Sequence, residues 1–264
     1  MNDPIGDRMK IYEGIEANRI LIPGLPICVR VDGRAFHTFT KGMQRPYDIT
    51  MSNAMIETMK YLVEETDARI GFVQSDEISL VLSDVKEPLF GGRVSKLTSV
   101  IASIATAKFN IEIHKFFPDK PMATFDCRVW SIPNRTEAAN TILWREFDAT
   151  KNSISMAART YYSHKQLLGK NSSQMQDMLM EKGVNWNNYP VFFKRGTYAR
   201  RVSVSRKFLP EELENLPAMH EARKNPDMEF TRNSIEIIDM PIFSKVVNRE
   251  DVIFEGAEPL VKEG

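Results

Sequence analysis

The sequence predicts an α/β protein of the α+β kind, built on a ferredoxin-like split β-α-β-β-α-β core. Two β-branched, apolar segments, residues 27–32 and 71–83, have the composition of buried strands. Apolar positions repeat with helical spacing after each of these segments. A further strand-like segment at 122–132 follows the second helical pattern. Such a core hosts many activities, so it does not by itself name a function.

The first helix is expected after a turn-rich stretch at 41–48, where Asp48 or Thr50 can cap it. Its apolar stripe is interpreted as core. The stripe consists of Met51, Met55, Met59 and Leu62. Gly71 precedes the next strand, and residues 76–83 stay extended, which predicts a tight hairpin or a long bent strand.

The second helix is expected at about 93–116, between the break at Gly91-Gly92 and the prolines that follow it. After residue 134 the sequence predicts three helices and then a basic, hairpin-like region. The helices are expected at 136–147, 152–168 and 172–182, the hairpin-like region at 190–206, and a last strand at Ser234–Ile238. We therefore divide the chain into a first unit, residues 1–135, and a helical and hairpin extension, residues 136–264.

The composition is that of an ordinary globular protein: 264 residues, 42% apolar and 27% charged. The formal net charge is zero, so nucleic-acid binding must come from a local basic patch. Cys28 and Cys127 are interpreted as buried, reduced thiols, and the four scattered histidines predict no zinc site. No leader-like start and no apolar run of ~20 residues is present, so we expect a cytoplasmic protein without membrane contact.

Acidic residues interrupt both predicted strands. Asp32 ends the first strand before Gly33, and Asp76 and Glu77 lie within the second strand region. Buried acid is unfavourable unless it is paired, hydrogen-bonded or bound to a cation. One aspartate from each of two adjacent strands, with a backbone carbonyl between them, can hold two divalent ions ~3.5–4 Å apart. Either motif alone is explained as well by a turn, but their joint occurrence favours a catalytic Mg²⁺ site.

Basic residues near these acids are interpreted as triphosphate ligands, although each alone fits a solvated charge. Arg93 and Lys96 share one face of the first turn of the long helix, where the helix dipole attracts anions. Four more basic residues surround the first acidic motif: Arg30, Arg34, Lys41 and Arg45.

The segment 191–207 holds six basic residues and no acid. Phe192, Phe193 and Tyr198 lie between them, a pattern that suits contact with an RNA backbone and stacking of bases. An edge strand protected by charge explains the same residues equally well.

The combined motifs resemble the tRNA(His) guanylyltransferase family and its "like" proteins, which add nucleotides in the 3′-to-5′ direction at the 5′ end of tRNA. The resemblance covers about residues 10–200. It rests on Asp32-Gly33-Arg34-Ala35-Phe36-His37, Gln74-Ser75-Asp76-Glu77, Arg93-Val94-Ser95-Lys96, Phe125-Asp126-Cys127-Arg128, Trp144-Arg145 and Lys194-Arg195-Gly196-Thr197.

The resemblance implies that residues 1–135 form a catalytic domain like the palm of ordinary polymerases. It also implies that the extension, residues 136–264, serves RNA binding and oligomer contacts. It implies two Mg²⁺ ions held by Asp32, the Gly33 carbonyl and Asp76, with Glu77 also needed for catalysis. The nucleotide-binding residues, for GTP and ATP as substrates, would be Arg30, Arg34, Phe36, His37, Lys41, Arg45, Ser75, Arg93 and Lys96. The RNA-binding residues would be Arg128, Asn152, Lys194, Arg195, Arg200 and Arg201. Family members are usually homotetramers, dimers of dimers.

One departure from the family pattern separates two functions. Enzymes dedicated to tRNA(His) carry His-Ile-Asn-Asn where this chain has Thr150-Lys151-Asn152-Ser153, and an asparagine of some members is Met156 here. This resembles the "like" branch, which repairs 5′-truncated tRNAs by template-dependent addition. We therefore expect a metal-dependent 3′–5′ nucleotidyltransferase for tRNA repair, and the nearest alternative is a tRNA(His)-specific enzyme that adds one G.

The sequence is also compatible with two functions of other classes, a non-catalytic RNA-binding module and a nucleotide cyclase. In a non-catalytic RNA-binding module the basic segment would matter and the acids would not. A nucleotide cyclase would share the palm chemistry but would need no RNA, which leaves the basic segment at 194–207 without a purpose.

Overall fold

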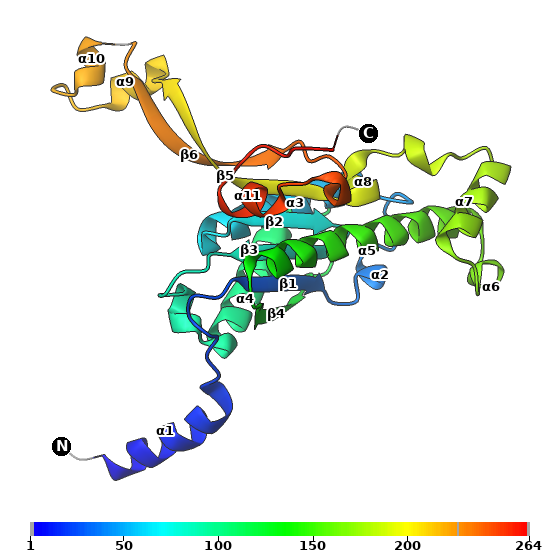
Figure 1. Ribbon diagram of the computed structural model, residues 1–264, viewed down its shortest axis with the longest axis horizontal. Helices are drawn as coiled ribbons and strands as arrows, with labels where there is room; N and C mark the ends of the chain where they lie inside the picture. The colour runs from blue at the N-terminus through cyan, green and yellow to red at the C-terminus, as the bar shows by residue number, and fades with distance from the viewer. Residues whose placement is uncertain (1–2, 226, 263–264) are drawn as a thin grey trace.

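A six-stranded sheet forms the centre of this computed structural model, which describes residues 3–225 and 227–262 (Figure 1). The strands are β1 Ile27–Gly33, β2 Ile70–Gln74, β3 Glu77–Leu82, β4 Phe125–Ser131, β5 Thr197–Lys207 and β6 Glu229–Ile238. Their order across the sheet is β4-β1-β3-β2-β5-β6, and all five neighbouring pairs are antiparallel. The helices are α1 Pro4–Ala17, α2 Phe36–Phe39, α3 Ile49–Thr66, α4 Val94–His114, α5 Arg135–Tyr161, α6 His164–Leu167, α7 Ser172–Glu181, α8 Val191–Arg195, α9 Pro210–Asn215, α10 Glu221–Lys224 and α11 Arg249–Phe254.

The predicted split β-α-β-β-α-β core is confirmed. Helix α3 connects β1 to β2, a tight turn connects β2 to β3, and α4 connects β3 to β4. The four strands adopt the order β4-β1-β3-β2 that this connectivity gives in ferredoxin-like folds. The carboxylate of Asp48 caps α3 by accepting hydrogen bonds from the N–H groups of Thr50 and Met51, at 2.9 and 3.1 Å.

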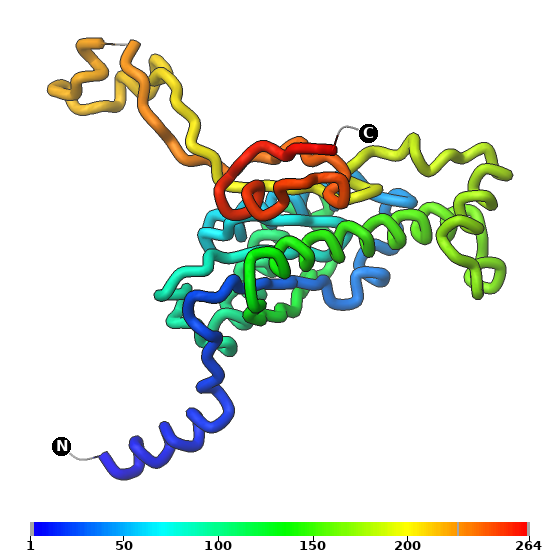
Figure 2. The backbone as a smooth tube through the Cα atoms, viewed as in Figure 1, coloured from blue at the N-terminus to red at the C-terminus, as the bar shows by residue number. Residues whose placement is uncertain are grey.

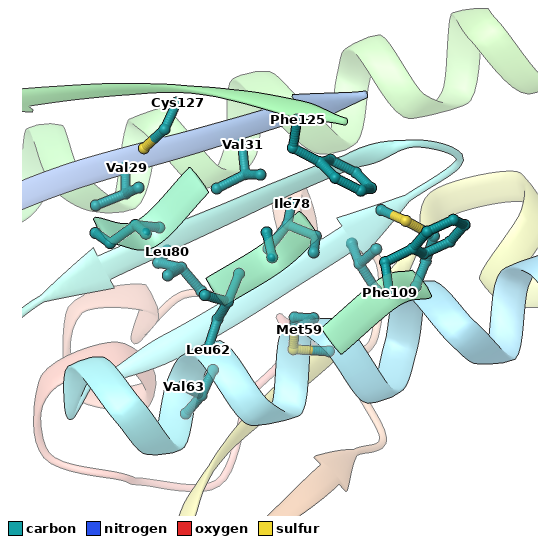
Figure 3. Close-up of a cluster of buried hydrophobic side chains, with 14 of the residues drawn as sticks. Val29, Val31, Met59, Leu62, Val63, Ile78, Leu80, Phe109, Phe125 and Cys127 are labelled. Atoms are coloured by element: carbon teal, nitrogen blue, oxygen red, sulfur yellow. The ribbon is translucent and has the colours of Figure 1, made fainter. Parts of the chain in front are cut away.

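Helices α3 and α4 cover one face of the sheet, where the main core lies (Figure 3). Because strand residues alternate between faces, Val29 and Val31 point into this core while Cys28 points away from it. The predicted apolar stripe of α3 is confirmed as core. Its members Met51, Met55, Met59 and Leu62 are all buried.

Helix α5 and the segment after β6 cover the other face. Cys28 is buried there, and Cys127 is buried on the α3–α4 side, so both are free thiols as expected. Burial raises the pKa of Cys28 to about 11 and that of Cys127 to about 12, which keeps both protonated at neutral pH.

Helix α5 is one continuous helix of 27 residues, so the prediction of separate helices at 136–147 and 152–168 was wrong. The stretch from Asp148 to Lys151 contains neither glycine nor proline, and nothing in it breaks the helix. Asn134 caps its start by accepting from the Glu137 N–H at 2.9 Å.

The basic region at 190–206 was also predicted wrongly, because it does not fold back on itself. Residues Val191–Arg195 form α8, and β5 then pairs along its length with β6, about thirty residues later. The predicted strand Ser234–Ile238 is the second half of β6. The ribbon of β5 and β6 extends beyond the sheet and carries α9 and α10 at its tip, as the tube in Figure 2 shows.

Helix α1 projects from the opposite side of the body (Figure 2) and buries none of its side chains. It leaves Ile5, Ile11 and Ile15 exposed. Among the described residues, no helix combines the length and the apolarity that crossing a bilayer requires.

Candidate active site

The end of β1 and the turn between β2 and β3 are joined by a backbone hydrogen bond. The Gly33 N–H donates to the Asp76 carbonyl at 3.0 Å. Ser75 and Asp76 form the two-residue turn between the paired residues Gln74 and Glu77. Ser75 has a φ of 56°, in the left-handed region, and its hydroxyl donates to Asp76 Oδ1 at 2.9 Å. The tight hairpin is therefore the correct one of the two sequence alternatives, and it carries Asp76 to the end of β1.

Three carboxylates meet at this point. Asp32 lies opposite Glu77 in the sheet register, and both line a hollow of about 350 Å³ together with Asp76. Burial raises the pKa of Asp76, and the nearby negative charge of Asp32 raises it further. Ionising Asp76 beside Asp32 is therefore unfavourable unless a positive charge lies nearby.

Glu77, unlike the two aspartates, forms an ion pair with an arginine. Arg145 of α5 donates from Nε to Oε1 at 2.5 Å and from Nη2 to Oε2 at 2.7 Å, while its Nη1 lies 3.1 Å from an oxygen of Asp148. Burial raises the pKa of Glu77, and Arg145 acts in the opposite direction. Within the described residues neither Asp32 nor Asp76 forms an ion pair, so these two differ from Glu77.

A second hollow, of about 480 Å³, lies on the other side of the turn. It is lined by Gly33, by residues of the segment from Ala35 to Met51, and by Met156 and Arg159 of α5. Ser75 and Asp76 line both hollows. The turn therefore stands between two spaces that can each receive part of a ligand.

The donor set fits Mg²⁺. Asp32 and Asp76 supply carboxylate oxygens. Gly33, whose carbonyl is the third expected oxygen ligand, follows Asp32 and is bonded through its N–H to the Asp76 carbonyl. Mg²⁺ prefers oxygen ligands and commonly uses only one or two carboxylates, with water and substrate phosphate completing its coordination. Across residues 3–225 and 227–262, no group of three or more His, Cys, Asp or Glu side chains suits a metal, so the site depends on this pair.

Several residues expected to bind nucleotide do lie around these hollows. Phe36, His37 and Arg45 line the second hollow, and Ser75 lines both. Arg30 lies on β1 with its guanidinium carbon 5.6 Å from the centre of the Trp144 ring. Arg34 and Lys41 are exposed and line neither hollow.

Arg93 and Lys96 are not brought to the acids within one chain. Strand β3 runs from Glu77 at the site to Leu82 at the other end of the sheet, and α4 begins only after that end. The start of α4, with both residues, therefore lies at the opposite end of the sheet from Asp32. There Lys96 Nζ lies 5.1 Å from the centre of the Phe90 ring.

The residues expected to bind RNA separate into two groups. Arg128 is exposed on the edge strand β4, and Asn152 of α5 lines the first hollow. Arg201 pairs with Asp67 at 3.2 Å, and Arg195 lines a third hollow next to Glu146.

Lys194 and Arg200 are buried and bonded inside the protein. Lys194 donates to the Asn187 carbonyl at 2.5 Å. Arg200 donates to the Ala257 carbonyl at 2.7 Å and to Glu258 at 2.8 Å.

Sequence reasoning named Asn152 and Met156 of α5 but gave no role to Arg145, Asp148 or Arg159. Arg145, Asp148, Asn152, Met156 and Arg159 follow one another at spacings of three and four and all line the first hollow. That helical spacing is visible in the sequence, but the expected break at 147–152 concealed it.

A four-stranded palm-like core with two aspartates at adjoining strand ends is an arrangement typical of metal-dependent nucleotidyltransferases. A model of the family described as tRNAHis guanylyltransferase matches residues 6–133. The chain belongs to the tRNA(His) guanylyltransferase family.

It is 31% identical to the tRNA(His) guanylyltransferase of Saccharomyces cerevisiae over 70% of this chain and 86% of that protein. An uncharacterised protein of Acanthamoeba polyphaga mimivirus is also 31% identical, over 76% of this chain and 78% of its own length.

Solved structures of the same family are also similar to this chain. A bacterial tRNA(His) guanylyltransferase-like protein in complex with ATP is 38% identical with a TM-score of 0.77, over 95% of this chain and 99% of that one. A bacterial guanylyltransferase-like protein in complex with GTP is 33% identical, with a TM-score of 0.70, over 94% of this chain and 97% of that one. The Saccharomyces cerevisiae enzyme is 29% identical, with a TM-score of 0.63, over 71% of this chain and 90% of that one. The chain is therefore a nucleotidyltransferase of this family.

Proposed function

We propose that this chain repairs 5′-truncated tRNAs by template-dependent 3′–5′ addition, using GTP or ATP and two Mg²⁺ ions. The observation that carries the proposal is the convergence of Asp32, Gly33 and Asp76 between two hollows. The departure at Thr150 to Ser153 from the His-Ile-Asn-Asn pattern favours repair over reading of one tRNA.

The protein's own residues provide the site for the ions. Asp32 and Asp76 would hold them together with the Gly33 carbonyl, because both carboxylates lack an ion-pair partner among the described residues. When bound, the ions would lower the pKa of the attacking 3′-hydroxyl and neutralise charge on the leaving group. Glu77 is the positioning member of the trio, since its bond to Arg145 fixes the start of β3 against α5.

Each of the two hollows would bind one of the two reactants. The second hollow, with Arg45, His37 and Phe36 in its lining, suits one nucleotide. The first hollow, with Asn152 in its lining, suits the RNA end. Each hollow is of the size that binds a small ligand.

The test is extension of an end-labelled tRNA that lacks its first nucleotides but keeps the complementary 3′ strand. We expect one added nucleotide for each missing base, chosen by Watson–Crick pairing. Asp76→Asn and Asp32→Asn should each lower the rate by about 10²–10³-fold or more, with RNA binding retained. Asp177→Asn, on the exposed side of α7, removes the same charge outside the site and should behave as wild type.

Other outcomes would name other functions. Addition of a single G to tRNA(His) alone would indicate the guanylyltransferase activity of the curated relatives. Near-normal extension by Asp76→Asn would remove the catalytic role of the pair. Full RNA binding without pyrophosphate release would indicate a non-catalytic module.

We also propose assembly into a homotetramer. The support is α1, whose side chains are all unburied although it carries three isoleucines. Exposed apolar surface of this kind is typical of an interaction site. Light scattering of the full chain should give four subunits, and the paired change Ile11→Asp with Ile15→Asp should reduce that number. A monomer at micromolar concentration would refute the assembly.

A further inference from the structure

The two hollows share a basic side chain. Four residues line both of them: Ser75 and Asp76 from the turn, and Met156 and Arg159 from α5. Arg159 is the only cation among these four, and its side chain is exposed to solvent. Arg159 therefore borders both spaces beside Asp76, and its side chain is long enough to turn its guanidinium to either of them.

The other cations of the hollows serve one side only. Arg145 lines the first hollow and is bound to Glu77 and Asp148. Arg45 and His37 line the second hollow alone. Within residues 3–225 and 227–262, Arg159 has no ion pair, and no hydrogen bond holds its guanidinium. Its five N–H donors remain available to a ligand.

We propose that Arg159 is a shared phosphate ligand, binding the triphosphate of the incoming nucleotide in one hollow and the phosphates of the RNA 5′ end in the other. This inference rests on the proposed function. A guanidinium presents N–H groups in a fixed fork that matches phosphate oxygens, so it can contact one oxygen on each side at once.

The chemistry of 3′–5′ addition requires two phosphate groups at this place together. The 3′-oxygen of the incoming nucleotide attacks the α-phosphorus of the 5′-triphosphate on the RNA, forming one P–O bond. The bond from that phosphorus to the bridging oxygen breaks, pyrophosphate leaves, and the hydroxyl proton passes to water. The incoming nucleotide keeps its own triphosphate throughout, so the anionic charge of two phosphate chains meets at Asp76.

A different role for Arg159 also exists. It lies in the last turn of α5, where the helix dipole favours a positive charge. That role predicts a change in stability and no change in phosphate binding. The test therefore measures binding separately from catalysis.

The variants are Arg159→Gln, Arg159→Lys and the control Lys170→Gln. Lys170 is exposed between α6 and α7 and lines neither hollow, so its loss removes the same charge without touching the site. Two single-step reactions are measured: adenylylation of 5′-monophosphorylated tRNA by ATP, and addition of one nucleotide to 5′-triphosphorylated tRNA. Inorganic tripolyphosphate is the binding probe, as an inhibitor of wild type and as a ligand in calorimetry.

We expect Arg159→Gln to lower kcat/KM about tenfold to a hundredfold in both steps, the loss expected for one charge-assisted contact. The affinity for tripolyphosphate should fall by a similar factor. Arg159→Lys should recover part of both, because a point charge replaces the fork. Lys170→Gln should match wild type, and the midpoint of thermal unfolding should be similar in all four proteins.

If Arg159→Gln lowers the rate of only one of the two steps, Arg159 serves a single hollow, and the proposal that it binds phosphates in both hollows is refuted. Unchanged tripolyphosphate affinity in Arg159→Gln would overturn the phosphate role altogether. If wild type itself adds no nucleotide to either RNA, the proposed function fails. If wild type is active and Arg159→Gln is equally active, the role of Arg159 is refuted and the proposed function is not.

Discussion

Glu77 and Arg145 join the start of β3 to the middle of α5 through two parallel hydrogen bonds, of 2.5 and 2.7 Å. The side chain of Arg145 is 7% exposed and that of Glu77 is 19% exposed. The pair is thus largely removed from water, and each group depends on the other for its charge balance.

We expect Arg145→Met to lower the free energy of unfolding by about 3 kcal/mol, because it leaves Glu77 buried beside Asp32 without its cation. The double variant Glu77→Gln with Arg145→Met should be less destabilised than the sum of the two single changes. Urea denaturation measures both. Asp7→Asn breaks the exposed pair with Lys10 on α1 and should change stability by less than about 0.5 kcal/mol. Strict additivity of the two site changes would contradict the coupling.

Mg²⁺ should stabilise the folded protein through the two aspartates. Asp32 and Asp76 repel one another, and a bound cation relieves that repulsion in the folded state only. Thermal scans with millimolar Mg²⁺ should therefore give a higher Tm than scans with a chelator. The shift should vanish in Asp76→Asn and persist in Asp177→Asn. An equal shift in Asp76→Asn would place the binding of the ion elsewhere.

Glu146 should make stability depend on pH. Its carboxylate accepts from the Tyr198 hydroxyl at 2.8 Å and from the Phe243 N–H at 2.9 Å, and burial raises its pKa above the ordinary 4.5. The folded chain therefore keeps a proton that the unfolded chain releases. The stability contribution is fully present below about pH 4.5 and is lost as pH rises through the folded pKa.

Two variants separate this effect from other titrations. Glu146→Gln can still accept from the Phe243 N–H and donate to the Tyr198 oxygen, so it should flatten the pH dependence of the free energy of unfolding above pH 4.5. Glu146→Ala leaves both partners unsatisfied and should lose about 2–4 kcal/mol. An unchanged pH profile in Glu146→Gln would assign the dependence to another group.

Gly196 should resist substitution. It has a φ of +87° between α8 and β5, and a Cβ there would lie 2.7 Å from the Val73 carbonyl oxygen and 2.5 Å from the Phe72 ring. We expect Gly196→Ala to destabilise the protein by about 3 kcal/mol or more, through strain and displacement of β2. Gly183→Ala, at a φ of +73° in open space, isolates the backbone strain and should lose only about 1–2 kcal/mol. Equal losses at the two positions, measured by denaturant titration, would show that the contacts of Gly196 contribute nothing.

The core could be predicted from sequence because its signals are local. The methionine stripe of α3, the proline stop after α4 and the strand composition around Val29 and Ile78 each lie within one element. The proximity of Asp32 and Asp76 could be predicted from the same signals, because the split β-α-β-β-α-β order places β1 beside β3.

The errors concern long-range pairing. The partner of β5 begins about twenty residues after β5 ends, and no local feature of Thr197–Lys207 identifies it. Buried bonds to distant groups, such as those from Arg200 to Ala257 and Glu258, are equally invisible in a basic sequence. The ion pair of Glu77 depends on a helix 68 positions away and needed the fold to be seen.

The unbroken length of α5 couples parts of the molecule that sequence separates. At Glu146 the helix anchors the backbone of Phe243, and three turns later its Met156 and Arg159 form the common wall of the two hollows. Because α5 is one unbroken helix from Arg135 to Tyr161, the bond to the Phe243 backbone and the wall shared by the two hollows belong to a single element. The C-terminal segment and the lining of both hollows are thus fixed to the same helix.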